Sequence, residues 1–230
     1  MPKRSAQKTA LLALLLLVPA QFIGALMSHV IAPGIIGQSI LFLTKIWMLA
    51  LPLFWLLQVD RNSIRIPKPT QRSLLTGMAM GIVMAATILV AYWLLGRYWI
   101  TPQQVRAKTQ EIGYITPLVY LAGAVYWTLI NSLLEEYVWR WFVFRKCEIL
   151  LPGITAVGLS ALCFTLHHTL ELSVLFQDWR VVGLGSLAVF SAGAIWSACY
   201  WLYRSIWSCY ISHALADSAI ALIGWHLLFA

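Results

Sequence analysis

Charged residues are scarce in this chain. Its 230 residues include 16 Lys and Arg and only 8 Asp and Glu, so charged residues make up 10% of the sequence and hydrophobic residues 61%. A soluble domain carries roughly 25% charged residues, which excludes an ordinary soluble protein. The bases lie near the ends of apolar runs rather than in one patch. They therefore indicate membrane topology and give no support to a nucleic-acid partner.

Several common catalytic and metal-binding patterns are also missing. The sequence contains no GxSxG and no HExxH, and spacing alone places no Ser or Cys as a nucleophile. The four cysteines have no CxxC spacing and lie in or beside apolar runs, so we expect reduced packing residues: Cys147, Cys163, Cys199 and Cys209. No internal repeat or low-complexity linker divides the chain. We therefore expect one transmembrane domain over residues 1–230, and the missing repeat disfavours an ion-coupled carrier.

Long apolar runs fill most of the chain. Because one span needs about 20 apolar residues, the length accommodates six to eight helices. The runs predict about seven spans, at residues 10–31, 36–58, 74–96, 115–145, 152–172, 181–203 and 206–228. Segment 98–114 is the longest polar connection, and we expect an exposed loop or a short interfacial helix there. The predicted fold class is an all-α, polytopic transmembrane helix bundle.

The distribution of bases predicts how the chain crosses the membrane. With a cytoplasmic N-terminus, that side collects Lys3, Arg4, Lys8, Arg61, Arg65, Lys68, Arg72, Arg145, Lys146 and Arg204, and the other side Arg97, Arg106, Lys108 and Arg180. The positive-inside rule thus favours a multi-pass cell-membrane protein with its N-terminus in the cytoplasm. An eighth helix within 30–58 would reverse the later spans. The first apolar run resembles a signal peptide but continues to Ile31, so we expect an uncleaved span.

A pair of glutamates interrupts the fourth apolar run. Glu135 and Glu136 are adjacent, and Arg140 follows four residues after Glu136 on the same helical face. Ionisable groups in such a segment cost several kcal/mol each unless they are paired or used. Glu136 is most simply the partner of Arg140 in a structural ion pair. Glu135 is a candidate for chemistry, with an ion pair to Arg140 as the alternative.

Other polar residues lie in the second, fifth and seventh runs. His167 and His168 are adjacent, so their side chains diverge by about 100° on a helix and only one can share the face of Glu135. His213 and Asp217 are four residues apart and lie on one helical face. Their side chains either contribute to a shared site or form a hydrogen bond that serves only helix packing. Lys45 lies within the second run, where snorkelling and a counter-ion role for the acids both remain open.

Helix geometry brings Glu135 and His168 to the same depth. The turn between the fourth and fifth spans should fall near Pro152 and Gly153. Glu135 precedes it, and His168 follows it, by about 16 residues, which corresponds to about 24 Å of helix on each side. A buried carboxylate beside an imidazole, joined by His213 and Asp217, can activate water and stabilise developing negative charge. Hydrolysis within the membrane is the chemistry that this set predicts.

Three short motifs on successive apolar segments resemble those of a known family. Glu135–Arg140 matches EExxxR, Phe164–His168 matches FxxxH, and His213–Asp217 matches Hxxx(N/D), in that order. Together they resemble the CPBP family of intramembrane proteases, also called the CAAX prenyl protease 2 or Abi family. The resemblance places the motif-bearing core at about 115–228 and leaves the first three spans supported by hydropathy alone. It implies a glutamate-dependent intramembrane endopeptidase, with C-terminal processing of the CAAX type as one candidate reaction.

The resemblance also implies a role for each motif residue. Glu135 is similar to the family's general base, His168 to the residue that holds the water, and His213 with Asp217 to the pair that stabilises the oxyanion. Supporting roles fall to Glu136, Arg140 and Phe164, with Phe164 shaping the pocket. CAAX-cleaving members typically carry Asn at the position of Asp217. Because an ionised Asp would oppose an oxyanion, Asp217 must be protonated here or must instead orient His213.

Two other classes of function use the same residues. Glu135, His168 and His213 could be the ligands of a zinc hydrolase. A non-enzymatic membrane protein of the bacteriocin-immunity or sensor type is the second alternative. The preferred interpretation needs no metal or other cofactor, and its partners are the lipid bilayer and a membrane-associated peptide or protein substrate.

Overall fold

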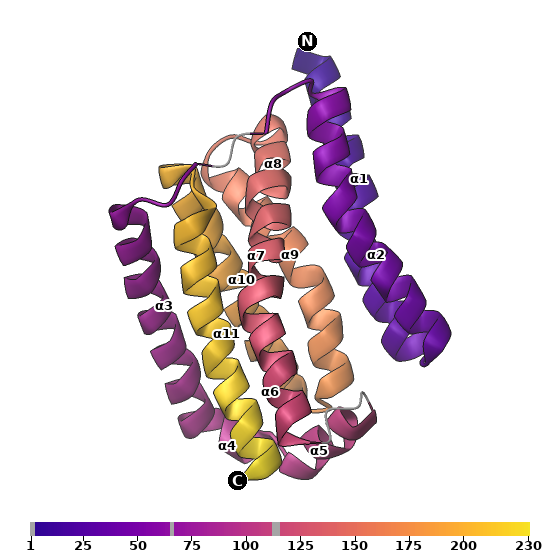
Figure 1. The fold of residues 1–230 in the computed structure, drawn as a ribbon, viewed down its shortest axis with the longest axis vertical. Coiled ribbons are helices and arrows are strands. Elements are labelled where there is room, and N and C mark those ends of the chain that lie inside the picture. The colour runs from indigo at the N-terminus through magenta and orange to yellow at the C-terminus, as the bar shows by residue number, and fades with distance from the viewer. Residues whose placement is uncertain (1–2, 65–66, 112–115) are drawn as a thin grey trace.

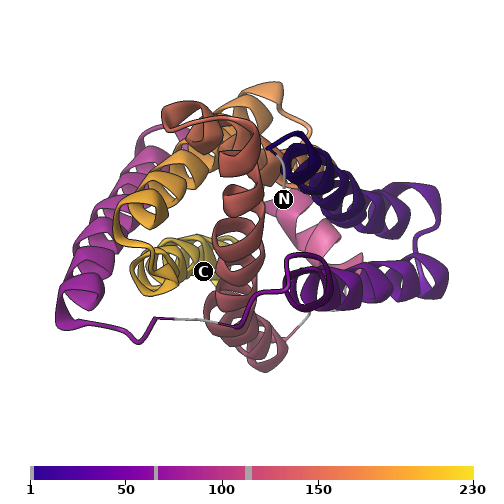
Figure 2. The same cartoon turned by 90° about the horizontal axis from the view of Figure 1, so that it is seen from above.

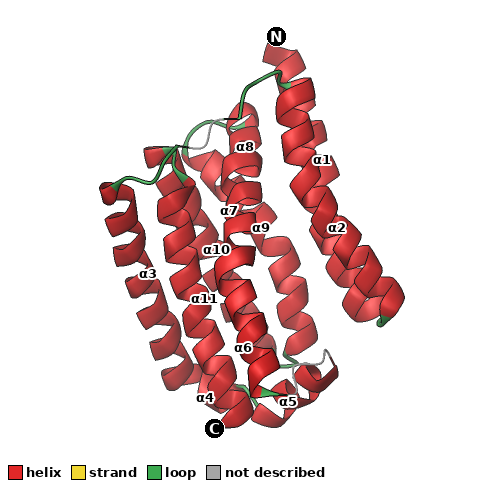
Figure 3. Cartoon of the chain, viewed as in Figure 1, coloured by secondary structure: helices red, strands yellow, loops and turns green. Residues whose placement is uncertain are grey.

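The computed structural model describes residues 3–64, 67–111 and 116–230, and every regular element in these ranges is helical (Figure 3). Several long helices contain π-helical segments (η) and therefore carry more than one label. The first three long helices consist of α1 (Lys3–Leu26) with η1 (Met27–Ile31), α2 (Ile35–Phe54) with η2 (Trp55–Val59), and α3 (Gln71–Ala91) with η3 (Tyr92–Gly96) and α4 (Arg97–Trp99). The all-α prediction is confirmed.

The remaining helices contain the three motifs. After the short α5 (Pro102–Glu111), one continuous helix comprises α6 (Pro117–Val125), η4 (Tyr126–Asn131), α7 (Ser132–Glu136), η5 (Tyr137–Phe144) and α8 (Arg145–Leu150). It is followed by α9 (Ile154–Leu175), α10 (Trp179–Tyr203) and α11 (Ile206–Phe229). Long helices thus occur at all seven predicted spans. The segment expected to be a loop or interfacial helix is largely helical, although residues 112–115 lie outside the described ranges.

Six helices of the described chain are long and apolar enough to cross a membrane. They are Arg4–Ile31, Ile35–Val59, Gln71–Trp99, Pro117–Leu150, Trp179–Tyr203 and Ile206–Phe229. The seventh long helix, α9, spans 22 residues but carries His167, His168 and Glu171, which lower its apolar content. The extra helix considered within 30–58 is absent, because residues 35–59 form one continuous helix. The protein is a multi-pass membrane protein, and its orientation stays a prediction.

The long helix from α6 to α8 runs through the middle of the molecule (Figure 1). It is flanked by α9, α10 and α11, while α3 lies on one side and the α1–α2 hairpin on the other (Figure 2). All seven residues from Val138 to Phe144 are buried, as expected for a helix surrounded by others. Aromatic side chains of α9 and α10, including Phe164 and Trp196, pack against this segment. The candidate site therefore lies next to a fully buried segment of this helix.

The turn between α8 and α9 confirms the predicted hairpin. Leu151 ends the first helix, with its N–H donating to the Cys147 carbonyl at 2.8 Å. Gly153 has a φ of 55°, in the left-handed region that glycine adopts without steric cost. Gly153 then precedes Ile154, where α9 begins. This turn fixes the relative depth of α7 and α9.

Helix α3 packs closely on α11, the helix that carries His213. A Cβ atom at Gly77 would lie 2.6 Å from the Ser208 carbonyl oxygen, and one at Gly81 would lie 3.0 Å from the Cα of Ser212. Close approach of two backbones at small residues is a common mode of helix packing in membranes. The third span thus supports the site although no motif lies in it.

We expect Gly77→Ala to destabilise the protein by about 1–3 kcal/mol, because the added methyl group meets backbone rather than a flexible side chain. The measurement is the loss of helical circular dichroism on heating in detergent. Gly183→Ala is the matched control: Gly183 is an exposed helical position with open space around it, so alanine there should be neutral or stabilising. Equal melting temperatures for both variants would contradict the close α3–α11 contact.

Candidate active site

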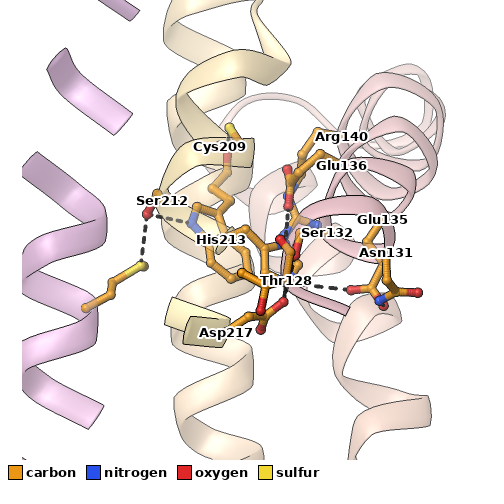
Figure 4. A network of polar contacts seen from close by, with 12 residues as sticks. Thr128, Asn131, Ser132, Glu135, Glu136, Arg140, Cys209, Ser212, His213 and Asp217 are labelled. Atoms are coloured by element: carbon orange, nitrogen blue, oxygen red, sulfur yellow. Dashed lines mark hydrogen bonds and ion pairs between the residues drawn. The ribbon is translucent and has the colours of Figure 1, made fainter. Parts of the chain in front are cut away.

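Three helices bring the predicted residues together around one carboxylate. The Oε2 atom of Glu135 on α7 lies 3.8 Å from Nε2 of His168 on α9 and 3.7 Å from Nε2 of His213 on α11. Glu135 and His213 are buried, whereas His168 is partly exposed. The prediction that Glu135 and His168 lie at one depth is confirmed. Figure 4 shows Glu135, His213 and their neighbours in this network.

The other oxygen of Glu135 is held by a residue that the motifs did not identify. The side-chain amide of Asn131 donates to Oε1 of Glu135 at 2.8 Å. Lys45 in turn donates to Oδ1 of Asn131 at 3.4 Å. Lys45 therefore belongs to the polar network of the site, which favours the counter-ion interpretation over snorkelling. The one signal for Asn131 in the sequence was its position four residues before Glu135, on the same helical face.

Glu136 links two other residues of the motifs. Its Oε2 lies 3.3 Å from Nε of Arg140, so the expected ion pair is present, and both side chains are 0% exposed. Its Oε1 forms a hydrogen bond of 2.8 Å with Nδ1 of His213. The Arg140 guanidinium carbon lies 4.7 Å from the ring centroid of Phe164 and 5.3 Å from that of Trp196. Because a cation is attracted to an aromatic face, these rings replace part of its lost hydration.

Phe164 also borders the histidines of the site. Its ring centroid lies 4.6 Å from that of His168 and 6.1 Å from that of His213. Trp196, which no motif identified, stacks on His213 with 4.1 Å between centroids and 20° between planes. Phe164 therefore packs at the site as expected. Together the two rings restrict the orientations that both imidazoles can adopt.

Asp217 lies at the site but is not bonded to His213. Its Oδ2 is 3.6 Å from Nε2 of His213, beyond hydrogen-bonding distance, and accepts a hydrogen bond of 2.7 Å from Ser132 Oγ. The suggestion that Asp217 orients His213 is therefore not supported, since Glu136 holds the Nδ1 atom of that ring. Sequence spacing placed both residues on one face of α11 but could not show which acid on α7 the imidazole meets.

His167 lies closer to Glu135 than its divergence from His168 suggested. It is 2% exposed and stacks on Trp139, with 5.3 Å between centroids and 8° between planes. Its ring centroid is also 4.0 Å from that of His168. The ring of His167 thus packs on Trp139 inside the bundle. The angle of about 100° between adjacent positions on a helix did not predict its proximity to His168, because the rotamers of the two side chains turn their rings toward each other.

The geometry also changes the expected metal ligands. Among the described residues, the group with metal-like spacing is Glu135, His167 and His168, whose ligand atoms lie within 4.8 Å of one another. His213, expected as the third ligand, is outside this group: its Nδ1 is bonded to Glu136 at 2.8 Å, and its Nε2 lies 3.7 Å from Oε2 of Glu135. A further acid, Glu171, has Oε2 at 3.7 Å from Nδ1 of His168.

The four cysteines are free, and three of them are buried. This agrees with their expected role as reduced packing residues.

Comparison with known protein families identifies the motif-bearing part of the chain. Residues 117–219 match the family described as type II CAAX prenyl endopeptidase Rce1-like. The match contains all three motifs and leaves the first three long helices outside. Comparisons with curated proteins and with solved structures gave no match. Residues 117–219 are thus similar to the CAAX-type, or CPBP, family of intramembrane proteases, as the three motifs led us to expect.

Proposed function

We propose that this protein hydrolyses peptide bonds of membrane-associated peptides or proteins with a water molecule activated by Glu135. The family match supports CAAX-type peptidase activity in general. The observation that carries the more specific proposal is that Glu135 faces His168 and His213, from two other helices, at 3.8 and 3.7 Å. A carboxylate between two imidazoles can accept a proton from a water molecule beside one ring, while the other ring stabilises the negative charge that develops on the substrate.

Glu135 and His168 act together on the water. The distance of 3.8 Å between their nearest atoms is too long for a direct hydrogen bond, but one water can bond to both at about 2.8 Å. His168 Nε2 is buried and has no hydrogen-bond partner among the described residues, which suits this role. Because Asn131 occupies Oε1 of Glu135, the free Oε2 is the basic atom.

The reaction needs one proton transfer in each direction. Glu135 takes a proton from water as the water oxygen attacks the carbonyl carbon of the substrate. The protonated Glu135 then gives that proton to the leaving nitrogen as the C–N bond breaks. This returns the carboxylate to its starting state, and no oxidant or further reactant is required.

His213 stabilises the oxyanion of the tetrahedral intermediate. Its Nδ1–H donates to Glu136, and a protonated ring also directs an Nε2–H toward the space between Glu135 and Asp217. The carboxylates of Glu135 and Glu136 lie 3.7 and 2.8 Å from its two ring nitrogens, an arrangement that stabilises the positive charge of the ring. Asp217 contributes as a protonated carboxyl group, because its charged form would repel the oxyanion.

The proposed activity is tested with purified protein in liposomes and a panel of peptides. The panel pairs prenylated and unprenylated peptides ending in a CAAX sequence with a transmembrane peptide that lacks one. Cleavage that requires Glu135 supports the peptidase, and the preferred peptide identifies the substrate class. The alternative is a non-enzymatic protein of the immunity or sensor type. It is supported if the protein cleaves none of the peptides and if its effect in cells persists in the Glu135→Gln variant.

The two adjacent histidines should respond differently to substitution. We expect His168→Ala to lower the cleavage rate by about 10²-fold or more, because the water loses its second partner. His167→Ala should retain most activity, since its ring packs on Trp139 and bonds to no described residue. Initial cleavage rates at equal amounts of folded protein provide the measurement. The reverse pattern would show that the FxxxH motif is misaligned by one residue.

Substitution of Asp217 tests whether its negative charge is needed. Asp217→Asn should preserve activity and reduce its loss at high pH, because an amide keeps the hydrogen bond from Ser132 and cannot ionise. Asp217→Ala should impair activity, because no donor then remains beside His213. The measurement is the pH dependence of kcat/KM for both variants. An inactive Asp217→Asn enzyme would show that the charge itself is required and would contradict the oxyanion role.

A further inference from the structure

We propose that Glu135, His167 and His168 form a binding site for a divalent metal ion such as zinc, and that its occupation inhibits the peptidase. The ligand atoms of these three residues lie within 4.8 Å of one another, and two of the side chains are buried. Imidazole and carboxylate are ligands that zinc prefers in proteins. His167 distinguishes this site from the peptidase site, because the proposed hydrolysis does not use it.

His167 supplies an independent reason to expect a ligand. Its side chain is only 2% exposed and forms no hydrogen bond with a described residue, and beside it Nε2 of His168 is fully buried and also lacks a hydrogen-bond partner there. Burying a polar group without a partner costs roughly 1–3 kcal/mol, so such groups usually have one. Stacking on Trp139 occupies the face of the ring but not its nitrogens. A metal ion bound in the ring plane would supply the missing partner.

The surroundings of the other two ligands match those of metal sites. A metal-bound histidine almost always donates its second N–H to a carboxylate, carbonyl or water, and a bound carboxylate is usually hydrogen-bonded as well. Here Nδ1 of His168 faces Glu171 at 3.7 Å, which leaves Nε2 for the metal. Asn131 donates to Oε1 of Glu135 at 2.8 Å, which leaves Oε2. Asn131 thus already holds Glu135 on the side away from the proposed ion, and the Glu171 carboxylate lies near His168 on the corresponding side of that ring.

The site should bind reversibly rather than permanently. Zinc bonds to nitrogen and oxygen at about 2.0–2.2 Å, so the three side chains must move closer together by rotating. Three protein ligands also leave the fourth position to water. Lys45, which bonds to Asn131, contributes a nearby positive charge that opposes a cation. These features favour an ion that enters and leaves with its concentration.

Inhibition follows from the identity of the ligands, and this step rests on the proposed function. The ion would use the Oε2 atom with which Glu135 accepts a proton and the nitrogen with which His168 holds the water. A carboxylate bound to zinc is a much weaker base, because its electron pair is shared with the metal. Zinc should therefore inhibit the enzyme without any contact with the substrate.

The test uses the full-length protein in detergent, stripped of metal by chelation and dialysis. Zinc binding is measured by equilibrium dialysis, cobalt binding by visible absorption, and cleavage across a zinc titration. His167→Ala is compared with His226→Ala, which removes an exposed histidine of α11 that lies outside this group. The wild type and His226→Ala should bind one zinc and lose activity by at least about 10-fold. His167→Ala should keep its metal-free activity, bind zinc about 10- to 100-fold more weakly and resist inhibition.

Each outcome supports or overturns the inference. Equal zinc binding by His167→Ala and the wild type, or no binding by the wild type, overturns the site. Activity that disappears on chelation and returns with zinc overturns inhibition and makes the enzyme a zinc hydrolase. If neither the metal-free nor the zinc-bound protein cleaves any peptide, only the proposed function is contradicted. The metal site is still tested, because equilibrium dialysis and cobalt absorption do not depend on cleavage. His167→Gln, which preserves size and polarity, replaces His167→Ala if the latter does not fold.

Discussion

Glu135→Gln should abolish peptide cleavage and leave the fold intact. Glutamine has the same size, and its carbonyl oxygen can still accept the hydrogen bond from Asn131. It cannot accept a proton from water, however, and loss of a general base usually costs about 10²- to 10⁴-fold in rate. The measurement is the initial rate of cleavage in liposomes, with thermal unfolding followed on the same preparation.

Glu148→Gln is the control for this experiment. Glu148 lies on the same long helix, but it pairs with Arg204, whose side chain is about half exposed. Its substitution should leave cleavage close to that of the wild type. Turnover by Glu135→Gln at the wild-type rate would remove Glu135 from the mechanism. Loss of activity together with loss of folding would instead assign Glu135 to structure.

Arg140→Met should have the largest effect on stability. Arg140 and Glu136 are both 0% exposed, and removal of one partner leaves a buried charge without compensation. Breaking a buried pair in this way costs about 3–5 kcal/mol in the free energy of unfolding. Methionine can still pack against Phe164 and Trp196, so little of the loss should come from a cavity. Unfolding in increasing denaturant, followed by circular dichroism in mixed micelles, provides the measurement.

Two further variants separate charge from packing in this prediction. Arg204→Met breaks the exposed pair with Glu148 and should cost only about 0–1 kcal/mol. Adding Glu136→Gln to Arg140→Met removes the unpaired charge and should recover part of the stability. It should not recover activity, because glutamine cannot hold a protonated His213 as a carboxylate does. Equal destabilisation by Arg140→Met and Arg204→Met would refute the importance of burial.

Much of the fold and of the site could be predicted from local pattern. Apolar runs of bilayer length determine the long helices, because backbone groups inside a membrane must be satisfied within the helix. The rise per residue then sets depth, so equal distances from the turn at Gly153 were enough to bring Glu135 level with His168. Spacing of four residues likewise predicted the pair of Glu136 and Arg140, because both side chains lie on one face of one helix.

Contacts between helices were decided only by the tertiary structure. His213 bonds to Glu136 rather than Asp217, Lys45 reaches Glu135 through Asn131, and His167 turns toward His168. Spacing along one helix states which residues share a face, but not the rotation of that helix about its axis or the rotamers of its side chains. Both depend on how several helices pack at once, and the close contact of α3 with α11 at Gly77 is part of that packing. The residues of the site were therefore readable from the sequence, whereas their partners depended on the assembled bundle.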